Sequence, residues 1–397
     1  MRRILFTAGF GFHGMFNSIL EYPPQGYEFI FPGKSISKKP QISKEQQLSK
    51  RMRNVVPLKN NSVRILLRCQ LRWYTEDIFK KTSINADLIF SPHDLVYSKK
   101  KPWVVMIEHV GDLCPKIYDI KHLGLYKSLI EKVLSAEWCK KIMPYLEINK
   151  MTLFKGLNCE RFEDKIEVVN LAIPPKKFKK EYGKDKISLL FLGTAHKSNI
   201  PKSFEERGGI ELLEAFKTLD TRYKNLELVI RSYVPPYIRN KYSQVLAQKN
   251  VKIFEQVLSM EEWENIMMNA DIFLFPGYID PALTILDAMS YELPVVATNW
   301  RGNCEMVENG VTGFLVRPPF GLKTDLPLSQ EFKKMLYARG PDMCLVKELV
   351  EKTSILIEDE RLRRRIGIAG RREIETGKFS INRRNEKLKK IFDEAIG

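Results

Sequence analysis

The sequence lacks the long apolar runs of membrane-spanning and secreted proteins. No apolar run in the 397 residues reaches the roughly 18–20 residues that a membrane-spanning helix needs. The first run, after a basic amino end, is interrupted by Gly9 and Gly11 before it is long enough for a secretory signal. The six cysteines form no CxxC pair and no disulfide-like spacing, which argues against a zinc site and for a reducing compartment. We therefore expect a cytoplasmic protein.

Acidic residues are scarce in the first half of the chain. Residues 1–180 contain 32 lysines and arginines against 17 acids, a charge of +15, whereas the remaining residues contain 33 and 31, a charge of +2. The densest basic tract, Lys34 to Lys59, is poor in aromatic residues and carries no nucleic-acid-binding signature. We expect no nucleic-acid ligand and a peripheral contact with the anionic inner face of a membrane. Solvated lysines that only keep the protein soluble are the alternative.

Short apolar runs alternate with polar or helix-patterned stretches, which predicts parallel sheets covered by helices. The chain is too long for one ordinary core, and Pro174-Pro175 cannot continue a helix or a central strand. We therefore expect two α/β domains, residues 1–178 and 179–378. The expected strands are residues 3–8, 27–31, 86–91, 103–107, 166–169, 187–193, 226–230, 251–254, 271–275 and 293–298.

The most specific segment, residues 271–289, predicts a strand, a short loop and a helix. Ligands of open α/β sheets bind outside the carboxyl ends of the strands, and free N–H groups at a helix start attract anions. Asp287 lies one turn into this helix, where a carboxylate can accept hydrogen bonds from a ribose diol. The alternative is that Asp280 caps the helix and Asp287 is a solvated acid. The expected N–H donors are Ala282, Leu283 and Thr284.

A wider pattern around this segment closely resembles the GT4 family of glycosyltransferases. DAMSYELPVVAT at residues 287–298 is similar to the EAM and GLPVVAT motifs of that family. EMVENGVTGFLV at residues 305–316 is similar to its EIV-x-x-G-x-x-G-x-LV motif. The resemblance is specific across residues 165–397 and weaker across 1–164.

Other segments agree with this resemblance. Gly193 ends a strand where the family has an F-x-G turn, and Arg207-Gly208-Gly209 stands where it has Lys-Gly. Residues 358–373 resemble the closing helix signature of the family, and Phe379-Ser380 resembles its crossover before the last helix.

The resemblance implies the GT-B fold: two Rossmann-like βαβ domains facing a central cleft, with the carboxyl-terminal helix, residues 379–397, returning to the first domain. It also implies a retaining glycosyltransferase whose donor is a nucleoside diphosphate sugar. The acceptor would be a glycan, a lipid-linked molecule or another hydroxyl compound. Because no DxD-type motif is evident, we expect no metal, and no cofactor besides the donor substrate.

The resemblance also implies roles for individual residues. Arg207 would hold the diphosphate as a permanently charged, two-pronged clamp, and Asp287 would bind the ribose. His109 would lie at a strand end near the transferred sugar. The expected donor site comprises Gly193, Thr194, Arg207, Gly208, Ala282, Leu283, Thr284 and Asp287. The expected acceptor site comprises Gly11, His13 and His93.

Two positions depart from the family pattern. The first glutamate of its E-x7-E stretch falls on Ile279, so its role moves to Asp280. The arginine after its F-x-G turn is Thr194 here, which leaves one phosphate-binding cation missing, although His196 and Lys197 are nearby in sequence. The main alternative is therefore a catalytically degenerate GT-B scaffold that binds nucleotides or glycans without turnover. The expected catalytic residues are His109, Arg207 and Asp280.

Overall fold

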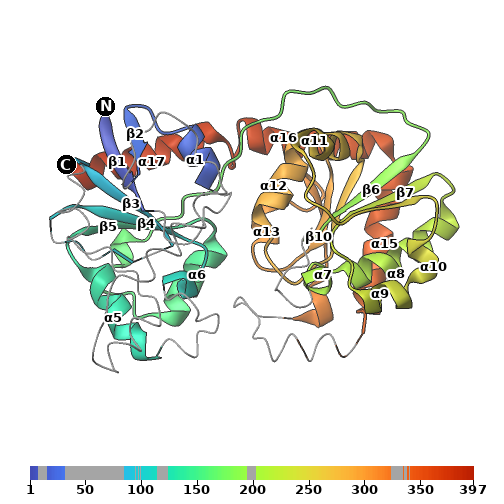
Figure 1. Ribbon diagram of the computed structural model, residues 1–397, viewed down its shortest axis with the longest axis horizontal. Helices are drawn as coiled ribbons and strands as arrows, with labels where there is room; N and C mark the ends of the chain where they lie inside the picture. Colours follow the sequence, from blue (N-terminus) through green and yellow to red (C-terminus); the bar gives the residue numbers. More distant parts are fainter. Residues whose placement is uncertain are drawn as a thin grey trace. The chain divides into compact units, whose positions relative to one another are not determined.

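The computed structural model divides the chain into two α/β units. Unit 1 contains Met1–Ala172 and Ile381–Gly397, and unit 2 contains Ile173–Ser380 (Figure 1). The expected boundary at residue 178 thus falls inside unit 2. Within the described residues, no helix is long and apolar enough to cross a membrane. The described residues are 1–7, 16–31, 85–93, 95–96, 98, 100–113, 124–194, 203–322, 334, 338 and 340–397.

Unit 1 is built on a parallel sheet of strand order β2-β1-β3-β4-β5. Its strands are β1 (Arg2–Phe6), β2 (Tyr27–Ile30), β3 (Leu88–Pro92), β4 (Trp103–Ile107) and β5 (Cys139–Pro144). Its helices are α1 (Asn17–Glu21), α5 (Gly124–Ser135), α6 (Glu147–Gly156) and α17 (Ile381–Ile396), with 3-10 turns η2 (Val110–Leu113) and η4 (Glu163–Lys165). The apolar strand β4 is buried along its whole length, as a sheet covered on both faces requires.

The last strand of unit 1 differs from the expected one. Residues 166–169 form no strand, and Ile166 makes only an isolated bridge to Ile142. The edge strand is β5 instead, whose sequence CKKIMP contains two partly buried lysines and a terminal proline. An edge strand needs no unbroken apolar run, so this strand gave no apolar signal in the sequence.

Helix α17 covers one face of the unit 1 sheet with an aromatic contact. The ring of Phe392 lies 5.2 Å from that of Tyr27, 6.4 Å from Phe29 and 6.3 Å from Phe90, all in edge-to-face geometry. Edge-to-face pairs at this spacing are favourable beyond the area they bury. The expected return of the carboxyl-terminal helix to the first domain is confirmed.

The same helix is fixed by one buried arginine. Arg384 is 3% exposed and donates hydrogen bonds to the Ser18 hydroxyl at 2.6 Å, the Ser18 carbonyl at 3.0 Å and the Tyr22 carbonyl at 3.0 Å. Its donors thus find acceptors on α1 and on the residue that follows it, so the buried guanidinium is satisfied.

Unit 2 is built on a parallel sheet of strand order β11-β10-β9-β6-β7-β8. Its strands are β6 (Ile187–Leu192), β7 (Leu226–Arg231), β8 (Val251–Phe254), β9 (Ile272–Phe275), β10 (Val295–Thr298) and β11 (Gly313–Val316). Its helices are α7 (Ser203–Glu206), α8 (Gly209–Arg222), α9 (Pro236–Lys241), α10 (Ser243–Leu246), α11 (Met260–Asn269), α12 (Ala282–Ser290), α13 (Asn303–Met306), α15 (Met343–Glu358) and α16 (Glu360–Glu375), with a 3-10 turn η5 (Pro319–Gly321). The strand order reverses between β6 and β9, which makes their carboxyl ends the ligand-binding switch point of an open sheet.

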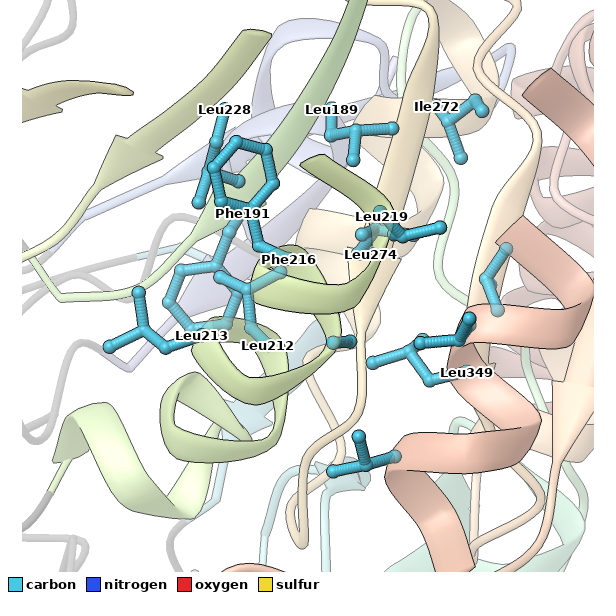
Figure 2. Close-up of a cluster of buried hydrophobic side chains, with 14 of the residues drawn as sticks. Leu189, Phe191, Leu212, Leu213, Phe216, Leu219, Leu228, Ile272, Leu274 and Leu349 are labelled. Carbon is cyan, nitrogen blue, oxygen red and sulfur yellow. The ribbon is translucent and has the colours of Figure 1, made fainter. Parts of the chain in front are cut away.

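The largest part of the unit 2 core lies between the sheet and helices α8 and α15. In Figure 2 apolar side chains of α8 lie against alternate residues of the central strands, and Leu349 of α15 belongs to the same cluster. Helices α12 and α13 lie on the other side of β10 from α8 and α15 (Figure 1). The α8 side chains of this core are Leu212, Leu213, Phe216 and Leu219. Their spacing places them on one helix face, which holds the amino end of α8 at the switch point.

We expect Arg384→Ala to lower the free energy of unfolding of unit 1 by at least about 2 kcal/mol, because three charge-assisted hydrogen bonds are lost and the buried Ser18 hydroxyl loses its donor. Arg383→Ala is the matched control, because the same residue type at the next position is exposed and should change stability by less than about 0.5 kcal/mol. Urea unfolding measures both values. Equal midpoints for the two variants would contradict the anchoring role.

Candidate active site

Two loops of unit 2 meet at the switch point without side chains between them. A Cβ atom on Gly208 would lie 2.2 Å from the carbonyl oxygen of Pro276, and one on Gly277 would lie 2.9 Å from the Cα atom of Arg207. Gly208 also has a φ of +82°, a conformation that favours glycine. The segment before α8 and the loop after β9 can therefore approach this closely only with glycine at both positions.

Gly193 and Thr194 follow β6 directly and border this contact. A Cβ atom on Gly193 would lie 2.0 Å from the Ser232 hydroxyl, so glycine is required there as well. The Thr194 hydroxyl lies 2.7 Å from the Ser203 hydroxyl, and the Thr194 carbonyl accepts a hydrogen bond from the N–H of Tyr233. The structure thus brings the expected donor residues 193, 194, 207 and 208 to the carboxyl ends of β6 and β9.

Arg207 brings an unneutralised positive charge to this place. The side chain is half-buried, and its Nε atom has no hydrogen-bond partner and no ion pair among the described residues. Desolvation lowers the pKa of Arg207 to about 10, the charge of Glu206 opposes this shift and that of Arg231 adds to it. The guanidinium stays charged at neutral pH, and a bound anion would supply the missing counter-charge.

Arg231 is a second cation at the switch point, and the sequence reasoning missed it. It ends β7, its carbonyl accepts a hydrogen bond from the N–H of Gly193 at 2.8 Å, and its Nη1 lies 3.4 Å from the carbonyl of Gly193. The guanidinium lies over the ring of Trp263, 5.7 Å from the centroid. Desolvation lowers its pKa. The available signal was a basic residue at the end of an apolar strand, LELVIR.

The start of α12 offers fewer free amides than expected. The N–H of Thr284 donates to the carbonyl of Pro281 at 2.8 Å, so this amide is already occupied. The N–H groups of Ala282 and Leu283 have no acceptor in the part of the chain that the structure describes. The anion receptor expected here is thus reduced to two amides at the first turn of the helix.

Asp280 is engaged by the neighbouring loop. Its Oδ2 accepts a hydrogen bond from Nε of Arg301 at 2.8 Å, and its Oδ1 accepts one from the N–H of Gly302 at 3.0 Å. The capping alternative is wrong, because the N-cap of α12 is Pro281, with no side-chain cap. The ion pair ties the loop after β9 to the loop after β10. The catalytic role of Asp280 stays a prediction.

Asp287 is not the solvated acid of the alternative. Desolvation raises its pKa to about 6, and the charge of Lys176 opposes this shift. Because burial makes ionisation of this carboxyl group unfavourable, hydrogen bonds from approaching hydroxyl groups would stabilise its charged form. The ribose-binding role of Asp287 stays a prediction.

The buried carboxyl group of Glu211 connects three segments next to the site. Glu211, in the first turn of α8, is 2% exposed. Its Oε1 accepts hydrogen bonds from the Tyr278 hydroxyl at 2.8 Å and from the N–H of Asp342 at 3.3 Å. Desolvation raises its pKa from the ordinary value of 4.5 to about 7, and these hydrogen bonds oppose the shift. Glu211 thus joins α8 to the loop after β9 and to the start of α15.

We expect unfolding free energy to fall as pH rises from 5 to 8, because the folded state binds the Glu211 proton more tightly than the unfolded state does. Glu211→Gln keeps the acceptor for Tyr278 but cannot ionise. The decrease in unfolding free energy between pH 5 and pH 8 should therefore be about 2 kcal/mol smaller in this variant than in the wild type. Urea unfolding at pH 5 and 8 measures it. The control is Glu261→Gln on the exposed surface of α11, which should keep the wild-type dependence. The same pH dependence in Glu211→Gln would contradict the assignment.

In unit 1 the expected catalytic histidine follows β4. Nδ1 of His109 accepts a hydrogen bond from the N–H of Gly111 at 2.9 Å, and its Nε2 lies 3.5 Å from Oδ1 of Asp112. The other Asp112 oxygen accepts the N–H groups of Glu108 and His109. In this arrangement Nε2 carries the proton and Asp112 orients the ring. The catalytic role of His109 stays a prediction.

His93 follows the neighbouring strand β3, so both histidines stand at the same edge of the unit 1 sheet. Its φ is +68°, and its Nε2 lies 2.9 Å from the Tyr145 hydroxyl. In the described part of the chain, no group of three or more His, Cys, Asp or Glu side chains is placed to hold a metal ion. The predictions for Gly11, His13, His196 and Lys197 lie outside the described residues.

Comparison with known proteins identifies unit 2. The family described as Glycosyl transferases group 1 matches residues 188–321, which run from β6 to the turn after β11 and contain both sides of the switch point. The glycosyltransferase resemblance expected from the sequence motifs is therefore confirmed for this segment, and the contact of Gly208 with Pro276 lies inside the matched residues.

Relatives of known structure share the fold of the whole chain. A glycosyltransferase from Rickettsia africae is 18% identical, with a TM-score of 0.59 over 100% of this chain and 98% of that one. Anabaena HepE, in complex with UDP and glucose, is 13% identical, with a TM-score of 0.58 over 99% of this chain and 100% of that one. The expected GT-B fold, with two Rossmann-like domains, is confirmed.

The chain also has relatives found by sequence. The capsular polysaccharide biosynthesis glycosyltransferase CapM of Staphylococcus aureus is 25% identical over 283 residues, which are 68% of this chain and 60% of that protein.

Proposed function

We propose that this protein is a glycosyltransferase that transfers a sugar from a nucleoside diphosphate sugar to a hydroxyl group. The observation that carries the proposal is the unneutralised guanidinium of Arg207 at the switch point, beside the first turn of α8. A cation and the free amides of a helix start together favour a diphosphate. The glycosyltransferase domain and the relatives with bound UDP support this class of donor.

In the proposed reaction, negative charge develops on the departing phosphate as the bond to the sugar breaks. Donors held in place before the reaction can contribute roughly 3–4 kcal/mol each to such a step. We assign this work to Arg207 and to the amides of Gly209, Ala282 and Leu283, so that fixed positive charge takes the place of a divalent ion. Retention of configuration, with the acceptor hydroxyl passing its proton to the leaving-group oxygen, is part of the proposal and rests on the resemblance to the GT4 family.

We expect Arg207→Ala to lower turnover at least a hundredfold with the fold intact, because the substitution removes a guanidinium with no ion pair among the described residues and keeps the backbone that makes the packing contact. UDP, ADP and GDP and their glucose conjugates are first screened by thermal shift, since a ligand of the folded state raises the midpoint. Release of the nucleoside diphosphate then measures turnover. Arg222→Ala, at the exposed far end of α8, is the control and should keep wild-type turnover. Near-normal activity of Arg207→Ala would discard the assignment.

A scaffold that binds without turnover is the second candidate. The contacts of Asp280 favour it, because both of its oxygens are engaged by Arg301 and Gly302, and Ile279 occupies the place of the first family glutamate. The same screen separates the two candidates. A nucleotide sugar that binds but is neither hydrolysed nor transferred to any acceptor would favour the scaffold.

We further propose that the acceptor is anionic or lipid-linked and that the protein works at the inner face of a membrane. The proposal rests on the charge of +15 in residues 1–180. Each basic residue near an anionic surface contributes about 1 kcal/mol of attraction. The basic tract of residues 34–59 lies outside the described residues, so the argument is one of charge alone.

Replacing Lys38, Lys39, Arg51 and Arg53 with glutamine should abolish binding to vesicles that contain anionic phospholipid, because about 4 kcal/mol of electrostatic attraction is lost. Vesicle sedimentation at low and high salt measures the effect. The control neutralises four basic residues of unit 2: Lys217, Arg222, Lys224 and Lys249. Partitioning that is unchanged in the first variant would remove the proposed membrane contact.

A further inference from the structure

Two guanidinium groups stand close together in unit 2 without carboxylate partners. Among the described residues neither Arg207 nor Arg231 forms an ion pair, and the Nε atom of each is buried without a hydrogen-bond partner. Arg231 ends β7, and its Nη1 lies 3.4 Å from the carbonyl of Gly193 at the end of β6. Desolvation lowers the pKa of Arg207, the charge of Glu206 opposes this shift and the charge of Arg231 adds to it. Two like charges that are partly removed from water repel each other, so a folded protein retains such a pair at a cost. An anion between them would remove that cost.

The position of Arg231 is fixed by its surroundings. Its backbone belongs to β7 and pairs with the end of β6, where Gly193 donates its N–H to the Arg231 carbonyl. The guanidinium lies over the ring of Trp263 on α11, and a cation over an aromatic face is attracted to it. Among the described residues its one hydrogen bond, from Nη1 to the Gly193 carbonyl, is long at 3.4 Å, and its buried Nε has no partner. The group is therefore held in place, and its remaining N–H donors have no acceptor among these residues.

The neighbouring position 194 carries no charge. Thr194 directly follows Gly193, and its hydroxyl is engaged with that of Ser203. A diphosphate at this place would therefore meet one cation from the segment before α8 and one from the end of β7, on the two sides of the carboxyl end of β6.

We propose that Arg231 is the second diphosphate-binding cation of the donor site and takes the place that Thr194 leaves without a charge. This inference rests on the proposed function, because it assigns a further binding residue to the same donor. The planar guanidinium can donate two parallel hydrogen bonds to phosphate oxygens, whereas an ammonium acts as a point charge. Arg207, just before α8, and Arg231, at the end of β7, bind the diphosphate together. The nucleoside lies beyond this clamp and does not depend on the charge.

The test compares Arg231→Gln, Arg231→Lys and the wild type in the full chain. Isothermal titration measures the affinity for UDP, ADP and GDP and for the matching nucleosides. Arg231→Gln should lower the affinity for the diphosphate that the wild type binds by at least tenfold. The affinity for the matching nucleoside should stay within twofold of the wild-type value. The diphosphate affinity of Arg231→Lys should lie between those of the wild type and Arg231→Gln, because lysine keeps the positive charge but lacks the planar pair of N–H donors. Arg222→Gln, the exposed control, should bind as the wild type does.

The possible outcomes distinguish a failure of this inference from a failure of the proposed function on which it rests. Wild-type diphosphate affinity in Arg231→Gln would overturn the inference and leave the proposed function standing. An equal loss for diphosphate and nucleoside would also overturn it, because Arg231 would then only shape the pocket. A wild type that binds none of the three diphosphates would overturn the proposed function and the inference together. If Arg231→Gln fails to fold, Arg231→Lys decides alone: a diphosphate-selective loss supports the inference, and unchanged affinity overturns it.

Discussion

The candidate site depends on a contact between two stretches of backbone. Gly208 and Gly277 have no side chains, so the segment before α8 can lie against the loop after β9. This contact places Arg207 at the point where the strand order of unit 2 reverses. Any larger residue at either glycine would push the two loops apart, because the opposing atoms are main-chain atoms that cannot turn away. The geometry of the candidate site therefore depends on the absence of a side chain at these two positions.

The charges around this contact follow a common pattern. The cations at the open end of the sheet, Arg207 and Arg231, have no carboxylate partners among the residues with described placement. Two acids near the site carry less free negative charge than exposed carboxylates do: Asp280 pairs with Arg301, and Glu211 has a pKa raised to about 7. These two acids therefore oppose a bound anion less than exposed carboxylates would. This separation suits a ligand that brings several negative charges of its own.

The sequence predicted most strands of both units, because buried parallel strands are unbroken apolar runs that stand out from their surroundings. It missed the edge strands β5 and β11. An edge strand tolerates the lysines of CKKIMP, and β11 is only four residues long. At the site, the positions of Gly193, Arg207 and Gly208 followed from motifs, because glycine at a close approach has no substitute. The contacts of Asp280 and the orientation of Arg231 depend on neighbours 21 and 32 positions away, Arg301 and Trp263. Such pairings arise from the fold and leave no local pattern.

The return of α17 to unit 1 reverses the order in which the two units can be completed during synthesis. Domains usually fold as the chain emerges, the amino-terminal one first. Here the aromatic face formed by Tyr27, Phe29 and Phe90 receives Phe392 only after the whole of unit 2 has been synthesised. Unit 2, which is continuous from Ile173 to Ser380, can close before α17 has left the ribosome. The unit whose synthesis begins first is thus completed after the unit that interrupts it.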